Sequence, residues 1–211
     1  MAANSITKEF DGFIMEACHG IGAATLAVAS QNYGAKKLDR IKSVIWLSML
    51  MQIVLCGALG LVLLFFGRNL CGIMTETKEV LDLCVVRIQT LSVFYVIVGI
   101  LNVLQEAIRG IGYSFTSLLV NIFANIVLRL IYLYFFYPSL KIADNVSYNL
   151  GLLYVLYPSC WTIGSIVATI VLVVLFNRVK KRFAQEKQET IVKQEENIVK
   201  QENIVKQAEN G

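Results

Sequence analysis

Charged residues are scarce over most of this 211-residue sequence. Asp, Glu, Lys and Arg make up 16% of it, whereas hydrophobic residues make up 56%. A soluble globular domain has about 25% charged and about 45–50% apolar residues. The mean hydropathy is +0.63. Such a composition indicates a membrane protein, and 8 of the 19 Lys and Arg residues fall in the last stretch, 178–211.

The residues that usually build metal sites and disulfide frameworks are also few. His19 is the only histidine, and the five cysteines are scattered without a CxxC spacing. This excludes a multi-histidine metal site and argues against a disulfide framework or a zinc site. No P-loop, GxSxG or HExxH motif occurs, and no basic groove with interleaved aromatic residues accompanies the net charge of +4. We therefore expect no enzyme, no metal, no cofactor and no nucleic-acid partner.

Long apolar runs predict five membrane-spanning helices, because a span needs about 20 mostly apolar residues. The predicted fold class is an all-α membrane protein, with a polar tail that is partly helical or disordered. Residues 1–11 precede the membrane domain 12–177, and the tail covers 178–211. The predicted helices lie at about 12–31, 44–67, 87–109, 113–137 and 150–177.

Basic residues predict how these helices are oriented. Four of them occupy the loop after the first helix, and another four, between Arg178 and Arg182, follow the last helix. Loops rich in Lys and Arg stay in the cytoplasm. The tail is therefore expected in the cytoplasm and the N-terminus outside. Because residues 1–11 contain no export signal, we expect that upstream helices are missing and the chain is truncated.

The tail contains the repeat IVKQEEN, IVKQEN, IVKQAEN. Its apolar pairs recur at seven and then six residues, which is close to a heptad but too short to define a coiled coil. Two interpretations of the tail stay open. It is either a solvated, partly helical extension or a segment that binds itself or a partner.

Three ordered segments resemble the multidrug and toxic compound extrusion (MATE) family of transporters. The first is AATLAVASQNYGAKK, a small-residue helix that ends in the turn Gln31, Asn32, Tyr33, Gly34. The second, QEAIRGIG, resembles the family's turn between the fourth and fifth helices of a lobe. The third, NIFAN, resembles the asparagine-rich fifth helix. The resemblance as a whole covers about residues 2–182, and it places the five helices as the eighth to twelfth of a twelve-helix transporter.

This resemblance implies a fragment of an antiporter that is driven by Na⁺ or H⁺. Its cargo would be drugs or other organic, often cationic, compounds, exported across the cytoplasmic (inner) membrane. The implied partners are the lipid bilayer, small organic substrates and a missing N-terminal lobe, while residues 1–11 would be the remnant of a preceding helix and loop. A lipid-linked saccharide flippase and a non-transporting relic or membrane assembly module stay open as alternatives.

Polar side chains inside predicted spans are the candidate pathway residues, since they are costly at membrane depth. Asn121, Asn125 and Arg129 follow each other at i+4 and share one helix face. At 1.5 Å per residue, Asn125 lies about 18 Å into a core of roughly 30 Å. These side chains either line a central cavity or hold neighbouring helices together.

Further candidates are spread over the other helices. Glu16 and His19 form either a proton relay or a solvated pair. Helices two, four and five contain no Asp or Glu, so a coupling carboxylate is expected in the missing lobe. The remaining pathway candidates are Gln52, Gln89, Asn102 and Trp161, and the candidates for a cytoplasmic turn or gate are Gln31, Asn32, Gly34, Glu106, Arg109 and Gly110.

Overall fold

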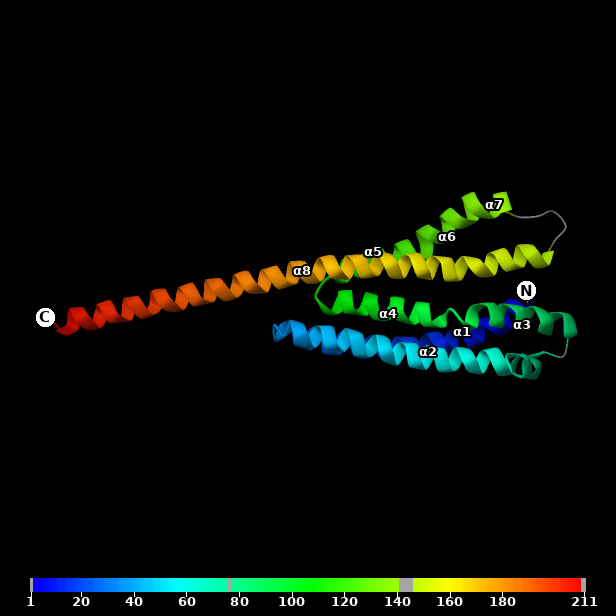
Figure 1. Ribbon diagram of the computed structural model, residues 1–211, viewed down its shortest axis with the longest axis horizontal. Helices are drawn as coiled ribbons and strands as arrows, with labels where there is room; N and C mark the ends of the chain where they lie inside the picture. Colours follow the sequence, from blue (N-terminus) through cyan, green and yellow to red (C-terminus); the bar gives the residue numbers. More distant parts are fainter. Residues whose placement is uncertain (1, 76, 141–145, 210–211) are drawn as a thin grey trace. The chain divides into compact units, whose positions relative to one another are not determined.

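The computed structural model describes residues 2–75, 77–140 and 146–209, and these form helices joined by short turns, without a strand (Figure 1). The chain divides into two compact units, Met1–Leu172 and Val173–Gly211. Four helices are long and apolar enough to cross a membrane, and a bent pair of helices makes a fifth candidate span. The prediction of an all-α membrane protein is confirmed, with four to five candidate spans.

The first two helices are α1 (Ala2–Gly34) and α2 (Leu38–Met74), which pack against each other. A tight turn joins them, in which Lys36 has a φ of 55°. We predicted that the first span starts at Gly12, but α1 already starts at Ala2. The charged residues of 1–11 resemble a loop in the sequence, yet they occupy regular turns of α1.

The third span is bent, contrary to the predicted single helix 87–109. It consists of α3 (Lys78–Ser92) and α4 (Tyr95–Gly110), which meet at an angle of 51°. Across the break, Phe94 donates its backbone N–H to the Leu91 carbonyl at 2.9 Å.

A glycine on α2 accommodates this break. A Cβ atom at Gly60 would lie 2.5 Å from the Ser92 carbonyl oxygen. Only a residue without a side chain allows the backbone of the break to approach α2 so closely. The bend thus depends on a contact between two helices that are distant in the sequence.

The fourth span contains α5 (Ser114–Ile122), α6 (Leu128–Ile131) and α7 (Tyr137–Leu140). Two π-helical turns, Phe123–Val127 and Tyr132–Phe136, join them without breaking the helix. We expected Pro138 to end this span, but the helix continues to Leu140. Pro138 lies just after the π-helical turn Tyr132–Phe136 and two residues before the end of α7, so the backbone hydrogen bond that proline removes is lost only at the end of the span.

The last helix, α8, runs from Val146 to Glu209 through Pro158. The predicted span 150–177 therefore lies inside one longer helix, and the expected partly helical tail is helical up to Glu209. The side chains of the repeat beyond residue 194 lie outside the described part of the chain.

Within the first unit, α4 contacts α1 and α2 and also α5. The α8 residue Ser165 donates its hydroxyl to the Ile97 carbonyl of α4 at 3.4 Å. On another side of α8, a Cβ atom at Gly164 would lie 2.7 Å from the Ala124 Cβ. This arrangement makes α4 a central element that faces both the early and the late helices.

Candidate functional site

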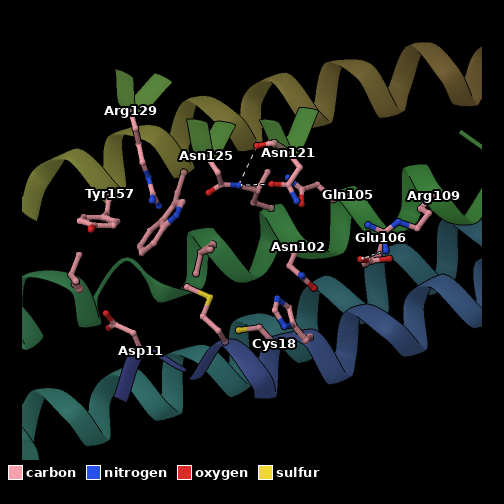
Figure 2. Close-up of a pocket in the computed structure, with 16 residues that line it drawn as sticks. Asp11, Cys18, Asn102, Gln105, Glu106, Arg109, Asn121, Asn125, Arg129 and Tyr157 are labelled. Atoms are coloured by element: carbon pink, nitrogen blue, oxygen red, sulfur yellow. Dashed lines mark hydrogen bonds and ion pairs between the residues drawn. The ribbon is translucent and has the colours of Figure 1, made fainter. Parts of the chain in front are cut away.

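A cavity of about 550 Å³ lies inside the first unit. Its walls come from α1, the α3–α4 pair, the span that begins with α5, and α8 (Figure 2). The long apolar helices put the cavity within the membrane-spanning part of the chain. Polar side chains from four spans therefore meet in a region where polar groups are costly.

Asn121, Asn125 and Arg129 line this cavity together, as their spacing predicted. Asn125 Nδ2 donates to Asn121 Oδ1 at 2.9 Å. The Arg129 guanidinium lies 4.7 Å from the centre of the Tyr157 ring, a cation–π contact. Arg129 Nε is buried and has no hydrogen-bond partner among the described residues. The three side chains thus present amide groups and a positive charge to the cavity.

Asn102, Glu106 and Arg109 reach the cavity from α4, together with Gln105. Glu106 and Arg109 form an ion pair at 3.1 Å. Three polar atoms are buried without a hydrogen-bond partner among the described residues. They are the amide oxygen of Asn102, the carboxylate oxygen Oε2 of Glu106 and the amide nitrogen of Gln105. The cavity therefore contains hydrogen-bonding groups that the fold itself leaves unused.

Aromatic rings close the end of the cavity near Arg129. Trp161, a predicted pathway residue, lines it beside Tyr157, with ring centres 6.0 Å apart. The Tyr95 ring, which is not part of the lining, has its centre 6.5 Å from that of Trp161. Tyr157 and Trp161 give the cavity wall an apolar and polarizable surface.

Asp11 is the most informative cavity residue that sequence reasoning missed. Its carboxylate forms an ion pair with Arg87 at 2.6 Å and accepts a hydrogen bond from the Tyr95 hydroxyl. Arg87 also donates to the Thr7 hydroxyl. We had assigned Asp11 to a loop remnant. Its distance of eight residues from His19, close to two helical turns, would have placed both on one helix face.

His19 lines the cavity, whereas Glu16 is exposed and is not among the lining residues. Cys18 also reaches the cavity, and its sulfur lies 3.1 Å from that of Cys56 on α2. All five cysteines are buried free thiols.

Several predicted residues lie away from the cavity. Gln52 is completely buried, and both polar atoms of its amide lack a hydrogen bond among the described residues. Gln89 is exposed. The turn candidates lie at helix ends: Asn32 donates to the Val28 carbonyl at 2.8 Å, Gln31 and Gly34 are exposed, and Gly110 packs on Ala29.

The fold and the cavity define a class of protein, the multi-pass helical membrane proteins with a polar chamber between their spans. Comparison with known proteins is more specific. The MatE family model matches residues 1–135, which is more than half of the chain. The chain belongs to this family of transporters, as its sequence motifs predicted. No curated protein matches the chain significantly.

Solved transporters share the fold. A multidrug resistance MATE family transporter of the MOP superfamily, in an outward-facing conformation, is 17% identical with a TM-score of 0.75, and the match covers 85% of this chain and 39% of that one. The MATE transporter ClbM, in complex with Rb⁺, is 19% identical with a TM-score of 0.75, over 86% and 42%.

A MATE transporter in a bent conformation is 17% identical with a TM-score of 0.76, over 87% of this chain and 39% of that one. The chain thus spans about two fifths of the length of these transporters. At such identities the matches establish the fold that is shared.

Proposed function

We propose that this chain is part of a secondary transporter that moves small organic compounds across the cytoplasmic membrane. The observation that supports this most directly is the polar cavity among its membrane-spanning helices. A cavity of about 550 Å³ falls within the range of small-molecule sites. In transporters built from two related lobes, the substrate site lies near the middle of the membrane between the lobes. Asn121 and Asn125 on the cavity wall would contact the cargo at that depth.

Coupling to a gradient of Na⁺ or H⁺ is the proposed driving force. Two carboxylates, Asp11 and Glu106, line the cavity, although the sequence led us to expect a coupling carboxylate outside this chain. Each carboxylate has an arginine partner. A cation would therefore have to compete with that arginine, and such competition can link ion binding to helix movement.

In this proposal the tail after residue 178 lies in the cytoplasm and the lipid bilayer surrounds the spans. A second lobe, in a separate chain or a longer one, completes the translocation pathway. The cargo would be exported in exchange for the coupling ion.

Transport can be tested with the full 211-residue chain, co-expressed with the N-terminal lobe of a MATE transporter that supplies the other half of the pathway, in a bacterial host that lacks its own efflux pumps. Retention of a panel of fluorescent dyes would be compared among the chain, Asn125→Trp and Ile126→Trp. Asn125 faces the cavity, whereas the neighbouring Ile126 is 53% exposed on the outside of the helix. We expect lower dye retention with the chain and with Ile126→Trp, and full retention with Asn125→Trp, because the indole fills the cavity.

Equal retention in all strains, including one with an empty vector, would contradict transport by this chain and would favour a non-transporting assembly module. Reconstitution in liposomes with a Na⁺ gradient or a pH gradient then identifies the coupling ion, since only the coupling gradient accelerates dye movement.

A further inference from the structure

The charges of the cavity do not balance one another. Two carboxylates, Asp11 and Glu106, line it, and each is paired with its own arginine, at 2.6 Å and 3.1 Å respectively. Arg129 also lines the cavity, but among the described residues it forms no ion pair. Figure 2 shows Arg129 beside Tyr157, at the opposite end of the cavity from Glu106. The cavity therefore has one uncompensated positive charge at this end.

An unpaired arginine at this depth is costly. Arg129 lies near the middle of the span Ser114–Leu140, and a charged side chain at the centre of a membrane helix is costly to insert. The Tyr157 ring compensates part of the charge through its π face. Arg129 Nε still has no described hydrogen-bond acceptor. A ligand that brings a negative charge would supply both the acceptor and the missing counter-charge.

Further along the cavity, toward Glu106, other groups provide donors for a longer ligand (Figure 2). Gln105 lines the cavity, is only 7% exposed, and its amide nitrogen has no described partner. In the pair Asn121–Asn125, the Asn125 nitrogen donates to the Asn121 oxygen, so the Asn121 nitrogen is not used in this pair. Arginine and amide donors together are the groups that bind carboxylates and phosphates.

Aromatic rings lie close to Arg129. The Tyr157 ring is 4.7 Å from the Arg129 guanidinium, and Trp161, whose ring centre is 6.0 Å from that of Tyr157, lines the same cavity. The faces of these rings can cover an apolar or aromatic group of a ligand. The site thus combines an anion-binding end with an apolar wall. These two features match the charged group and the apolar group of an amphipathic organic anion.

We propose that this cavity binds organic anions, with a carboxylate or a phosphate ester on Arg129 and an apolar or aromatic group against Trp161. This inference rests on the proposed transport function and specifies the charge of its cargo, in contrast to the cationic compounds that the family resemblance led us to expect. The same phosphate chemistry occurs in lipid headgroups and in free metabolites.

Binding can be measured through Trp161 itself. The sequence has two tryptophans, and the other, Trp46, is 74% exposed on α2, so Trp46→Phe leaves Trp161 as the only indole fluorophore. The full chain in neutral detergent would be titrated with three nitroaromatic quenchers: 4-nitrobenzoate, 4-nitrobenzyl alcohol and 4-nitrobenzyltrimethylammonium. They share the quenching ring and differ in charge.

We expect 4-nitrobenzoate to bind at least about tenfold more tightly than the alcohol, which corresponds to about 1.4 kcal/mol, and the ammonium compound to bind most weakly. Arg129→Gln should remove the preference for the anion and leave binding of the alcohol unchanged. Arg129→Lys should keep much of the preference for the anion, because the positive charge is retained. The control Arg68→Gln, at a 67% exposed arginine outside the cavity, should bind like the parent.

Tighter binding of the ammonium compound than of 4-nitrobenzoate would overturn the inference, and so would an anion preference that survives in Arg129→Gln. If Arg129→Gln fails to fold, the inference is still tested by Arg129→Lys and by the relative affinities of the parent chain for the three quenchers of different charge. Competition by dihexanoyl phosphatidic acid, but not by inorganic phosphate, would identify a lipid-borne phosphate. Displacement by phenyl phosphate would identify a free anion. Because binding is measured without transport, its failure is distinct from a failure of the dye-efflux experiment.

Discussion

Removal of either partner of the ion pair between Asp11 on α1 and Arg87 on α3 should strongly destabilise the first unit. Its atoms lie 2.6 Å apart, and the Arg87 and Asp11 side chains are 6% and 21% exposed. Loss of one partner from a buried pair costs about 3–5 kcal/mol, because the remaining charge is left unpaired. Asp11 is partly exposed, so we expect about 3 kcal/mol, the lower end of that range, for either Asp11→Asn or Arg87→Gln.

A second ion pair provides the matched control. Arg68 on α2 and Asp82 on α3 lie 3.4 Å apart, with side chains 67% and 65% exposed. Exposed pairs contribute about 0–1 kcal/mol. Arg68→Gln and Asp82→Asn should therefore change the free energy of unfolding little, although this pair also connects α3 to an earlier helix.

The assay is a double-mutant cycle for each pair, with the chain unfolded by sodium dodecyl sulfate in mixed micelles and followed by circular dichroism. The coupling energy of Asp11 with Arg87 should exceed that of Arg68 with Asp82 by about 1–2 kcal/mol, given the different burial of the two pairs. Equal coupling energies in the two cycles would refute this reasoning.

Three further changes probe helix packing. Oxidation with copper–phenanthroline should join Cys18 to Cys56, whose sulfurs are 3.1 Å apart, and mass spectrometry should then find both thiols protected from alkylation. Gly60→Ala should destabilise the chain by about 1–3 kcal/mol, because its Cβ would lie 2.5 Å from a backbone carbonyl at the α3–α4 break; thermal unfolding measures this. Gln52→Leu should raise the unfolding midpoint, because it removes two buried polar atoms without hydrogen bonds.

Each of these changes has its own control. Cys160 is buried elsewhere on α8, and Cys160→Ser should leave the cross-link intact. Gly72→Ala meets open space and should be neutral or slightly stabilising, because alanine favours helix by about 1 kcal/mol over glycine. An unchanged midpoint in Gly60→Ala, free alkylation of Cys56 after oxidation, or a lower midpoint in Gln52→Leu would show that the corresponding contact is misjudged.

The spans were predictable because a long run of apolar residues indicates a membrane-spanning helix. The break in the third span was not predictable, since it contains no proline and involves the close approach of the Ser92 carbonyl to Gly60 on another helix. The first turns of α1 were also missed. Charged residues at a helix end carry no apolar signal, so residues 2–11 resembled a loop.

The site was predictable where its residues share one helix. Asn121, Asn125 and Arg129 recur at i+4, and the structure places all three on one cavity. Asp11 was not predictable in the same way, because its role depends on Arg87, a partner 76 residues away. The spacing of residues along the sequence identifies those that share one face of a helix. Which faces of different helices contact each other depends on how the helices pack.

Asp11 also connects the bend of the third span to the cavity. Arg87 lies on α3 and Tyr95 is the first residue of α4, and both donate to the Asp11 carboxylate. The carboxylate therefore holds the two sides of the 51° break together from α1. Tyr95 also stands 6.5 Å from Trp161 on the cavity wall. A change in the bend would displace Tyr95 and, with it, this wall, so the shape of the cavity and the angle of the break must change together.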